Sequence, residues 1–314
     1  MRALVTGAAG FIGSTLVDAL LAAKHDVVGV DCFIDYYPRA LKDRNLVAAR
    51  GDPRFRFVEA SIVDAPLAPL LDGVDVVFHE AAQAGVRASW GDDFRIYSDN
   101  NVFGTQRLLE ACRAGTVKKV VCASSSSVYG DTDDLPMREA SRPQPVSPYG
   151  VTKLAAEHLT WLYWQNYGVP TVSLRYFTVY GPRQRPDMAF HRFIKAVLQG
   201  EPIRLYGDGD QTRDFTYVDD IVAVNLAAAS ADVAGRVFNV GGGSRTTVNE
   251  VIATIGEMVG RKPRVERLAP QKGDVRHTAA DTSLARSLLG YAPRVPLREG
   301  LEREVVWLRE VFGL

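Results

Sequence analysis

The chain has 314 residues, of which 46% are hydrophobic and 24% are charged. Because 37 Lys and Arg residues balance 37 Asp and Glu residues, bulk charge gives no reason to expect binding to nucleic acid or to a membrane surface. The three cysteines, Cys32, Cys112 and Cys122, are too far apart in sequence to indicate a disulfide framework or a metal site. Since neither a signal segment nor a membrane-spanning apolar run is evident, we expect a cytoplasmic protein with no membrane partner and no metal.

The first predicted strand, at residues 3–5, leads into a glycine turn, Gly7-Ala8-Ala9-Gly10-Phe11-Ile12-Gly13, and then into a helical pattern over residues 14–21. Glycines at such a turn let backbone N–H groups approach a pyrophosphate at the helix N-terminus. The spacing is GxxGxxG rather than GxGxxG, and a purely structural turn is the alternative.

The second predicted strand, at residues 27–30, ends in Asp31, eighteen residues beyond Gly13. A carboxylate at this position can accept hydrogen bonds from ribose hydroxyls and repels a 2′-phosphate. The sequence therefore favours NAD over NADP as the cofactor.

Further strand-like runs lie at residues 55–58, 74–78, 118–123 and 171–174, mostly with helical patterns between them. This alternation predicts an α/β fold with a doubly wound parallel sheet of the Rossmann type. After residue 176 the chain contains Gly-Pro turns, a strand-like run at 237–240 and helical patterns near 248–259 and 297–311. We predict an NAD-binding domain at 1–175 with a return strand near 236–240, and a smaller, interleaved substrate-binding domain at 176–314.

The predicted strand at 118–123 runs into four serines, Ser124 to Ser127. Ligands of open α/β sheets bind beyond the carboxyl ends of the strands, so these hydroxyls should line the site. A flexible serine-rich loop is the alternative, and the apolar strand directly before it disfavours that interpretation.

Ser147 and Pro148 are typical of a helix start, and they place Tyr149 and Lys153, four residues apart, on one helix face. The Lys153 ammonium, the helix N-terminus and an oxidised nicotinamide would each favour the phenolate form of Tyr149. Tyr149 could then take a proton from a substrate hydroxyl. A Tyr and a Lys at this spacing can also occur by chance, but their position after the fifth strand disfavours chance.

The glycine turn, Asp31, Ser125, Tyr149 and Lys153 together resemble the extended short-chain dehydrogenase/reductase family, whose members act on nucleotide sugars. Segment 174–189 is similar to that of UDP-glucuronate 4-epimerases in particular. The resemblance implies an NAD-dependent isomerase that epimerises UDP-glucuronic acid to UDP-galacturonic acid at C4 through a transient 4-keto intermediate. It also implies a homodimer built through a four-helix bundle.

The resemblance implies roles for individual residues. The catalytic residues would be Ser125, Tyr149 and Lys153. The cofactor would be bound by Gly7, Gly10, Phe11, Ile12, Gly13, Asp31, Ala81, Asn100, Tyr149, Lys153 and Tyr176. The UDP-hexuronate would be bound by Arg87, Ser125, Ser126, Ser127, Tyr149, Thr178, Arg185, Arg192, Tyr206, Arg213 and Arg276. Within that set, Arg213 and Arg276 would hold the diphosphate, and Tyr206 would lie by the uracil.

Two departures from related enzymes narrow the reaction. Ser126 and Ser127 stand where dehydratases of the family carry an Asp-Glu pair, and Ser127 stands where UDP-glucuronate decarboxylases carry Glu. Both departures favour epimerisation. The alternatives are a UDP-glucose 4-epimerase or a UDP-glucuronate decarboxylase on the same scaffold and, more remotely, a non-catalytic NAD-binding regulator.

Arg185 offers a planar guanidinium, which suits the C6 carboxylate of a hexuronate. A solvated arginine in an arginine-rich loop is the alternative. The helical patterns near 92–114 and 149–167 carry more apolar residues than one buried face needs, among them Trp161, Tyr163 and Trp164. Either a dimer interface or core packing would explain this excess.

Overall fold

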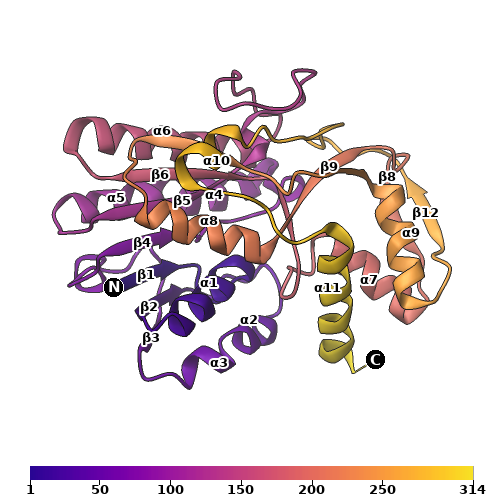
Figure 1. Cartoon of the computed structure of the whole chain (residues 1–314), viewed down its shortest axis with the longest axis horizontal. Helices are drawn as coiled ribbons and strands as arrows, with labels where there is room; N and C mark the ends of the chain where they lie inside the picture. The colour runs from indigo at the N-terminus through magenta and orange to yellow at the C-terminus, as the bar shows by residue number, and fades with distance from the viewer. Residues whose placement is uncertain (314) are drawn as a thin grey trace.

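Seven apolar segments pair into one parallel sheet in the computed structural model of the chain, which describes residues 1–313. The strand order is β10-β6-β5-β4-β1-β2-β3 (Figure 1). This order confirms the predicted doubly wound α/β fold. The strands are β1 (Arg2–Thr6), β2 (Asp26–Asp31), β3 (Phe55–Glu59), β4 (Val76–His79), β5 (Lys119–Ser125), β6 (Thr171–Tyr176) and β10 (Arg236–Val240).

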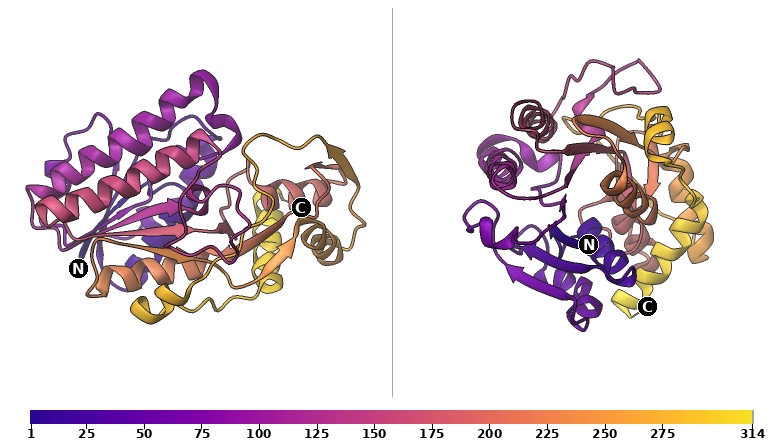
Figure 2. Two further views of the ribbon diagram at one scale, coloured as in Figure 1. Left: turned by 90° about the horizontal axis from the view of Figure 1, so that it is seen from above. Right: turned by 60° about the vertical axis from the view of Figure 1, so that its left-hand side comes forward.

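Helices cover both faces of this sheet, as Figure 2 shows from above. On one face α1 (Phe11–Ala22) packs against α8 (Val218–Ser230), and on the other α5 (Gly104–Arg113) packs against α6 (Pro148–Tyr167). The central strands β1, β4, β5 and β6 are buried on both faces and therefore read as nearly continuous apolar runs, whereas the edge strand β3 exposes Arg56 and Glu59. Five further short helices lie in the connections between the strands of this sheet: α2 (Arg39–Asn45), α3 (Val47–Arg50), η1 (Ala68–Leu70), η2 (Arg87–Ser89) and η5 (Ser126–Val128).

The helix expected near 92–114 is not one regular α-helix. It begins with η3 (Gly91–Asp93) and α4 (Phe94–Tyr97), widens into a π-helical segment, η4 (Ser98–Phe103), and becomes α5 at Gly104. A π turn holds more residues than an α turn, and such segments are frequent at functional sites. Here the π segment carries Asn100, which lines a cavity, and the buried Asn101.

Apart from α8, β10 and α10 (Ser283–Leu289), the elements after β6 build a smaller layer beyond the carboxyl ends of the strands (Figure 1). A three-stranded sheet has the order β11-β9-β7, and a separate pair joins β12 to β8. Its strands are β7 (Thr178–Tyr180), β8 (Ile203–Tyr206), β9 (Thr212–Tyr217), β11 (Arg245–Thr247) and β12 (Val265–Leu268). The helices of this layer are α7 (Ala189–Gln199), α9 (Val248–Val259) and α11 (Leu297–Phe312). The helix α10 packs instead against β10 and α8 of the large sheet.

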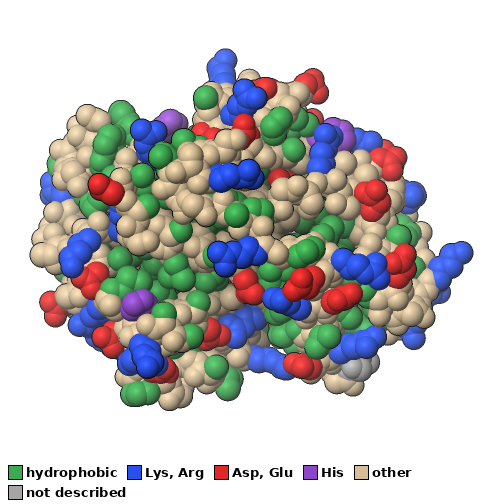
Figure 3. All heavy atoms as spheres, in the orientation of Figure 1, with side chains coloured by type: hydrophobic (Ala, Val, Ile, Leu, Met, Phe, Trp, Pro, Cys, Tyr) green, Lys and Arg blue, Asp and Glu red, His purple; other side chains and the backbone are tan. Residues whose placement is uncertain are grey.

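Charges of both signs are interspersed over the visible surface, in keeping with the balanced composition (Figure 3). Among residues 1–313, no helix combines the length and apolar character needed to cross a bilayer. No cluster of potential metal ligands occurs in the same residues.

Candidate active site

The glycine turn between β1 and α1 has space for backbone only. Gly7 has φ +71°, and a Cβ there would lie 2.8 Å from the backbone nitrogen of Ala81. A Cβ on Gly13 would lie 2.1 Å from the carbonyl oxygen of Gly7. Gly10 has no side chain that could cap the first turn of α1, so the backbone N–H groups of that turn are available to an anion. The turn therefore fits a pyrophosphate.

Asp31, at the end of β2, holds the neighbouring backbone in place. Its carboxylate accepts hydrogen bonds from the Ala9 N–H at 3.1 Å and from the Phe33 N–H at 2.8 Å. Burial raises the pKa of Asp31 above its ordinary value, although both N–H donors act in the opposite direction. Asp31 also lines the adjoining cavity, so it connects the glycine turn to the predicted ribose site.

Tyr149 and Lys153 lie at the start of α6, as predicted. The Ser147 hydroxyl accepts a hydrogen bond from the Gly150 N–H at 3.1 Å, and Pro148 occupies the first turn. Tyr97 packs edge-on against Tyr149 with ring centroids 6.3 Å apart. The helix start thus fixes the phenol in a cavity wall rather than leaving it in solvent.

Two adjoining cavities contain nearly all the predicted site residues. The first, which we call the cofactor cavity, is lined by every residue that the sequence assigned to the cofactor: Gly7, Gly10, Phe11, Ile12, Gly13, Asp31, Ala81, Asn100, Tyr149, Lys153 and Tyr176. The second, the substrate cavity, has a volume of about 790 Å³. Of the predicted substrate residues, its lining includes Arg87, Ser125, Ser126, Ser127, Tyr149, Thr178, Arg185, Arg192, Tyr206 and Arg213. Tyr149, Tyr176 and Arg185 line both cavities and therefore mark their junction.

Arg185 meets a carboxylate of the protein itself. Its Nε donates to Asp187 Oδ1 at 3.0 Å and its Nη2 to Asp187 Oδ2 at 2.9 Å. Burial opposes the guanidinium charge, yet Asp187 keeps the pKa of Arg185 above its ordinary value. The Tyr36 hydroxyl, from the loop after β2, also donates to Asp187 at 3.3 Å. Asp187 thus occupies the Nε–Nη2 edge of the guanidinium, so a ligand carboxylate would bind at the other edge, formed by Nη1 and Nη2.

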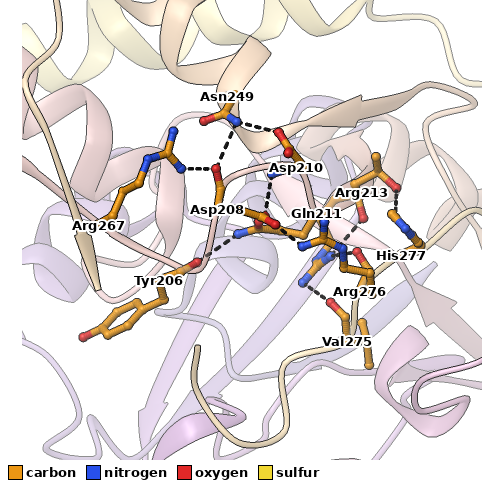
Figure 4. A network of polar contacts seen from close by, with 11 residues as sticks. Tyr206, Asp208, Asp210, Gln211, Arg213, Asn249, Arg267, Val275, Arg276 and His277 are labelled. Carbon is orange, nitrogen blue, oxygen red and sulfur yellow. Dashed lines mark hydrogen bonds and ion pairs between the residues drawn. The ribbon is translucent and has the colours of Figure 1, made fainter. Parts of the chain in front are cut away.

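Arg213 lines the substrate cavity, and Arg276 lies next to it but outside the cavity wall (Figure 4). Arg213 donates to the carbonyl oxygens of Val275 and Arg276, at 2.7 and 3.2 Å. Burial lowers the pKa of Arg213, and the charges of Arg87 and Arg276 add to this effect. An anion would relieve that repulsion.

Arg276 is the one predicted substrate residue that is not in a cavity wall. Its Nη1 pairs with Asp208 at 2.8 Å, and about half of its side chain is exposed (Figure 4). The guanidinium would have to leave Asp208 to reach a diphosphate, and this role stays a prediction.

Two arginines that the sequence assigned to the substrate, Arg87 and Arg192, lie against the ring of Tyr206. The Arg87 guanidinium carbon lies 4.3 Å from the centre of the Tyr206 ring, and that of Arg192 lies 5.9 Å from it. Arg87 also pairs with Asp274 at 2.6 Å. Tyr206 thus already contacts two cations, and its contact with a uracil stays a prediction.

The sequence did not indicate three further groups at or beside the site: Glu80, Asn101 and the ion pair of Glu157 with Arg175. Glu80 directly follows β4 and lines the cofactor cavity. Asn101 fixes the main chain at Gln83, accepting from its N–H at 2.7 Å and donating to its carbonyl at 3.0 Å. Ser124 donates to the buried Glu157, which pairs with Arg175. A polar residue at the end of a buried strand is a signal that would have found Glu80.

The fold and this site define a class: an α/β enzyme that binds a dinucleotide along the carboxyl edge of its sheet and presents a Tyr-Lys pair to a second ligand. The family model described as NAD dependent epimerase/dehydratase matches residues 3–241. The chain belongs to that family.

Three similar proteins cover nearly the whole chain. An uncharacterized UDP-glucose epimerase of Bacillus subtilis is 46% identical over 99% of both chains. A UDP-glucuronate 4-epimerase of Thermodesulfobacterium geofontis is 39% identical over 99% of this chain and 97% of its own. The crystal structure of the UDP-glucuronic acid 4-epimerase of Bacillus cereus, in complex with UDP-glucuronic acid and NAD, is 46% identical. It has a TM-score of 0.97 and covers 99% of this chain and 100% of its own.

Proposed function

We propose that this protein is an NAD-dependent 4-epimerase that interconverts UDP-glucuronic acid and UDP-galacturonic acid. The observation that carries this proposal is the junction of the two cavities, where Tyr149 and Arg185 line both. A proton acceptor and a carboxylate partner thus meet where a cofactor and a sugar would meet. Bound NAD would accept the hydride from C4 of the sugar and return it to the opposite face.

Tyr149 takes the proton of the 4-hydroxyl and later gives it back. Lys153, one helical turn further along α6, supplies the positive charge that favours the phenolate and holds the nicotinamide ribose. Ser125 accompanies them as a hydrogen-bond partner of the 4-hydroxyl. Because oxidation and reduction cancel, one retained cofactor serves every turnover.

Arg185 binds the C6 carboxylate of the hexuronate. Oxidation at C4 creates a β-keto acid, which loses carbon dioxide when its C5–carboxylate bond stands perpendicular to the carbonyl plane. We infer that Arg185, with Ser126 and Ser127, holds the carboxylate away from that alignment. The 4-keto sugar then turns in the substrate cavity while Arg213 and Arg276 hold the diphosphate and Tyr206 contacts the uracil.

Product analysis tests the proposal. Purified protein is incubated with UDP-glucuronic acid and catalytic NAD, and products are resolved by NMR. We expect UDP-galacturonic acid without a UDP-pentose. A UDP-pentose as the main product would replace the proposal with a decarboxylase. Turnover of UDP-glucose alone would favour the second candidate, a UDP-glucose 4-epimerase, which the name of the Bacillus subtilis relative supports.

We also propose a homodimer built on α6 and the segment before α5. Apolar side chains there are about half exposed: Phe103 at 50%, Val151 at 48% and Trp161 at 49%. A four-helix bundle formed with a second copy would bury them.

Two further organisational proposals concern domains and location. We propose an NAD-binding domain at 1–175 completed by β10, with 176–314 mainly binding the substrate. The three cysteines are free thiols, two of them buried, as a reducing compartment would keep them. We therefore propose a cytoplasmic location.

A further inference from the structure

Glu80 lines the cofactor cavity and carries a buried carboxyl group that the proposed reaction does not use. It follows β4 immediately, at the carboxyl end of that strand, and shares the cavity wall with Tyr149, Lys153 and Tyr176. A Cβ on Gly7 would lie only 3.0 Å from the Glu80 carbonyl carbon, so the glycine turn packs directly against this segment. Glu80 therefore stands where the cofactor path and the catalytic pair come together.

Hydrogen bonds fix the Glu80 carboxyl from one side. The Tyr176 hydroxyl donates to Glu80 Oε1 at 2.8 Å, and Asn225 Nδ2 donates to the same hydroxyl at 2.7 Å. Because Asn225 donates to the Tyr176 hydroxyl, the proton of that hydroxyl points to Glu80. This arrangement holds a carboxylate in place without neutralising its charge, and no ion pair within residues 1–313 includes Glu80.

The groups that face Glu80 from the surrounding elements keep one charge state near neutral pH. His79 of β4 bonds to Thr6 and Thr105, and burial lowers its pKa to about 3. Burial raises the pKa of Cys122 of β5 and that of Tyr176 of β6 far above neutrality. Lys153 of α6 is the cation whose charge favours ionised Glu80.

Glu80 itself titrates near neutrality. Burial raises its pKa to about 7, against the hydrogen bond from Tyr176 and the charge of Lys153, which both lower it. Its pKa therefore exceeds that of an ordinary glutamate, and its charge is lost as pH falls through about 7.

The oxidised nicotinamide ring carries a positive charge that the reduced ring lacks. A carboxylate in the same poorly solvated cavity stabilises the charged ring over the neutral one. This step rests on the proposed function in one respect, namely that the nicotinamide lies at the Tyr149 end of the cavity.

We propose that Glu80 is a cofactor-selecting residue, whose carboxylate makes the site bind NAD⁺ in preference to NADH. Such selection suits an epimerase, because the enzyme must end each turnover with its cofactor oxidised and its sugar reduced. An uncharged residue at position 80 would let the reduced cofactor and the 4-keto sugar accumulate.

The test compares dissociation constants of NAD⁺ and NADH, measured by calorimetry without any sugar at about pH 6 and about pH 8. For the wild type, we expect the preference for NAD⁺ to grow on the order of tenfold as pH rises through about 7. In Glu80→Gln, the ratio of the dissociation constants of NADH and NAD⁺ should not change with pH. The matched control is Glu304→Gln, which alters a buried carboxyl outside both cavities that accepts the Gly181 N–H.

A second variant separates this role from simple support of the fold. Tyr176→Phe removes the donor to Glu80, so the pH at which the preference appears should move upward. A wild-type ratio that is constant with pH, or a Glu80→Gln ratio equal to that of the wild type at about pH 8, would overturn the proposal. If the wild type shows the expected pH-dependent preference for NAD⁺ but epimerises no UDP-hexose, the role of Glu80 is supported and the proposed function is contradicted.

Discussion

Single side chains carry the chemistry because the backbone around them leaves little freedom. Tyr149 is held at the start of α6 by the Ser147 cap and by the edge-on contact with Tyr97. An ordered phenol that lines both cavities can reach a sugar hydroxyl without a large movement. The function of the residue is therefore open to a direct test.

Tyr149→Phe keeps the ring and removes the hydroxyl. We expect kcat to fall by about 10²–10⁴-fold, the usual contribution of a general base, with NAD binding retained. Rates of UDP-galacturonic acid formation and calorimetry with NAD⁺ measure the two effects. Tyr167→Phe, at the exposed end of the same helix, is the control. Full activity in Tyr149→Phe would remove the residue from the mechanism.

Arg185→Ala should change which sugar the enzyme accepts. Loss of the guanidinium removes a bidentate partner of the hexuronate carboxylate, so kcat/KM for UDP-glucuronic acid should fall about 30- to 1000-fold. Turnover of UDP-glucose should change far less. The neighbouring Arg183, which pairs with Asp18 instead, gives the control Arg183→Ala. Equal losses on both sugars would contradict a role in carboxylate recognition.

At the level of elements, a buried ion pair ties α6 to the middle of the sheet. Arg175 of β6 donates to both oxygens of Glu157 of α6, at 2.8 and 2.7 Å, and both side chains are 5% exposed. Ser124, at the end of β5, donates to the same Glu157. Glu157 therefore joins the helix that carries Tyr149 both to β6 and to the strand that carries the serine run.

Replacing one partner of the Arg175–Glu157 pair should lower the free energy of unfolding much more than replacing both. Arg175→Met would leave Glu157 buried without its cation, and we expect the free energy of unfolding to fall by about 3–5 kcal/mol. The double variant Arg175→Met/Glu157→Met should recover most of that loss. Urea denaturation measures both. The exposed pair Lys118–Asp75 gives the control Lys118→Ala, with almost no change expected. A double variant no more stable than the single one would contradict this explanation.

The stretch from η3 to α5 shows what periodicity leaves out. Apolar spacing indicated a helix near 92–114, and the chain is helical from Gly91 to Arg113, but its winding changes along the stretch and includes the π-helical segment η4. The buried Asn101 donates to the Gln83 carbonyl and to the Thr152 hydroxyl, both distant in sequence. Such bonds are invisible to a local pattern, and they determine which way this segment faces.

For the whole molecule, the proposed dimer predicts a change in mass. The double variant Phe103→Glu/Trp161→Glu places charges on the exposed apolar face of the segment before α5 and of α6, and we expect it to sediment as a monomer. The wild type and the control Val47→Glu, altered at an apolar residue of α3 that is 69% exposed, should sediment as dimers. Analytical ultracentrifugation distinguishes the two masses. A monomeric wild type at every concentration would sink the proposed assembly.

The sequence by itself determined the features that depend on local backbone geometry. The turn at Gly7 and Gly13, Asp31 at the end of a strand, and the capped helix start before Tyr149 and Lys153 each require particular residues within a few positions. Alternation of strands and helices was enough for the parallel sheet, because short crossovers leave few other topologies.

Only the tertiary structure decided how side chains from distant segments meet. It brings the Tyr36 hydroxyl to Asp187, directs Arg276 to Asp208 rather than into a cavity, and connects Glu80 through Tyr176 to Asn225. These contacts join separate strands, helices and loops, and no spacing along the chain encodes them. They form because packing removes water from polar groups, and each buried group must then find a partner among whatever side chains the fold has brought near.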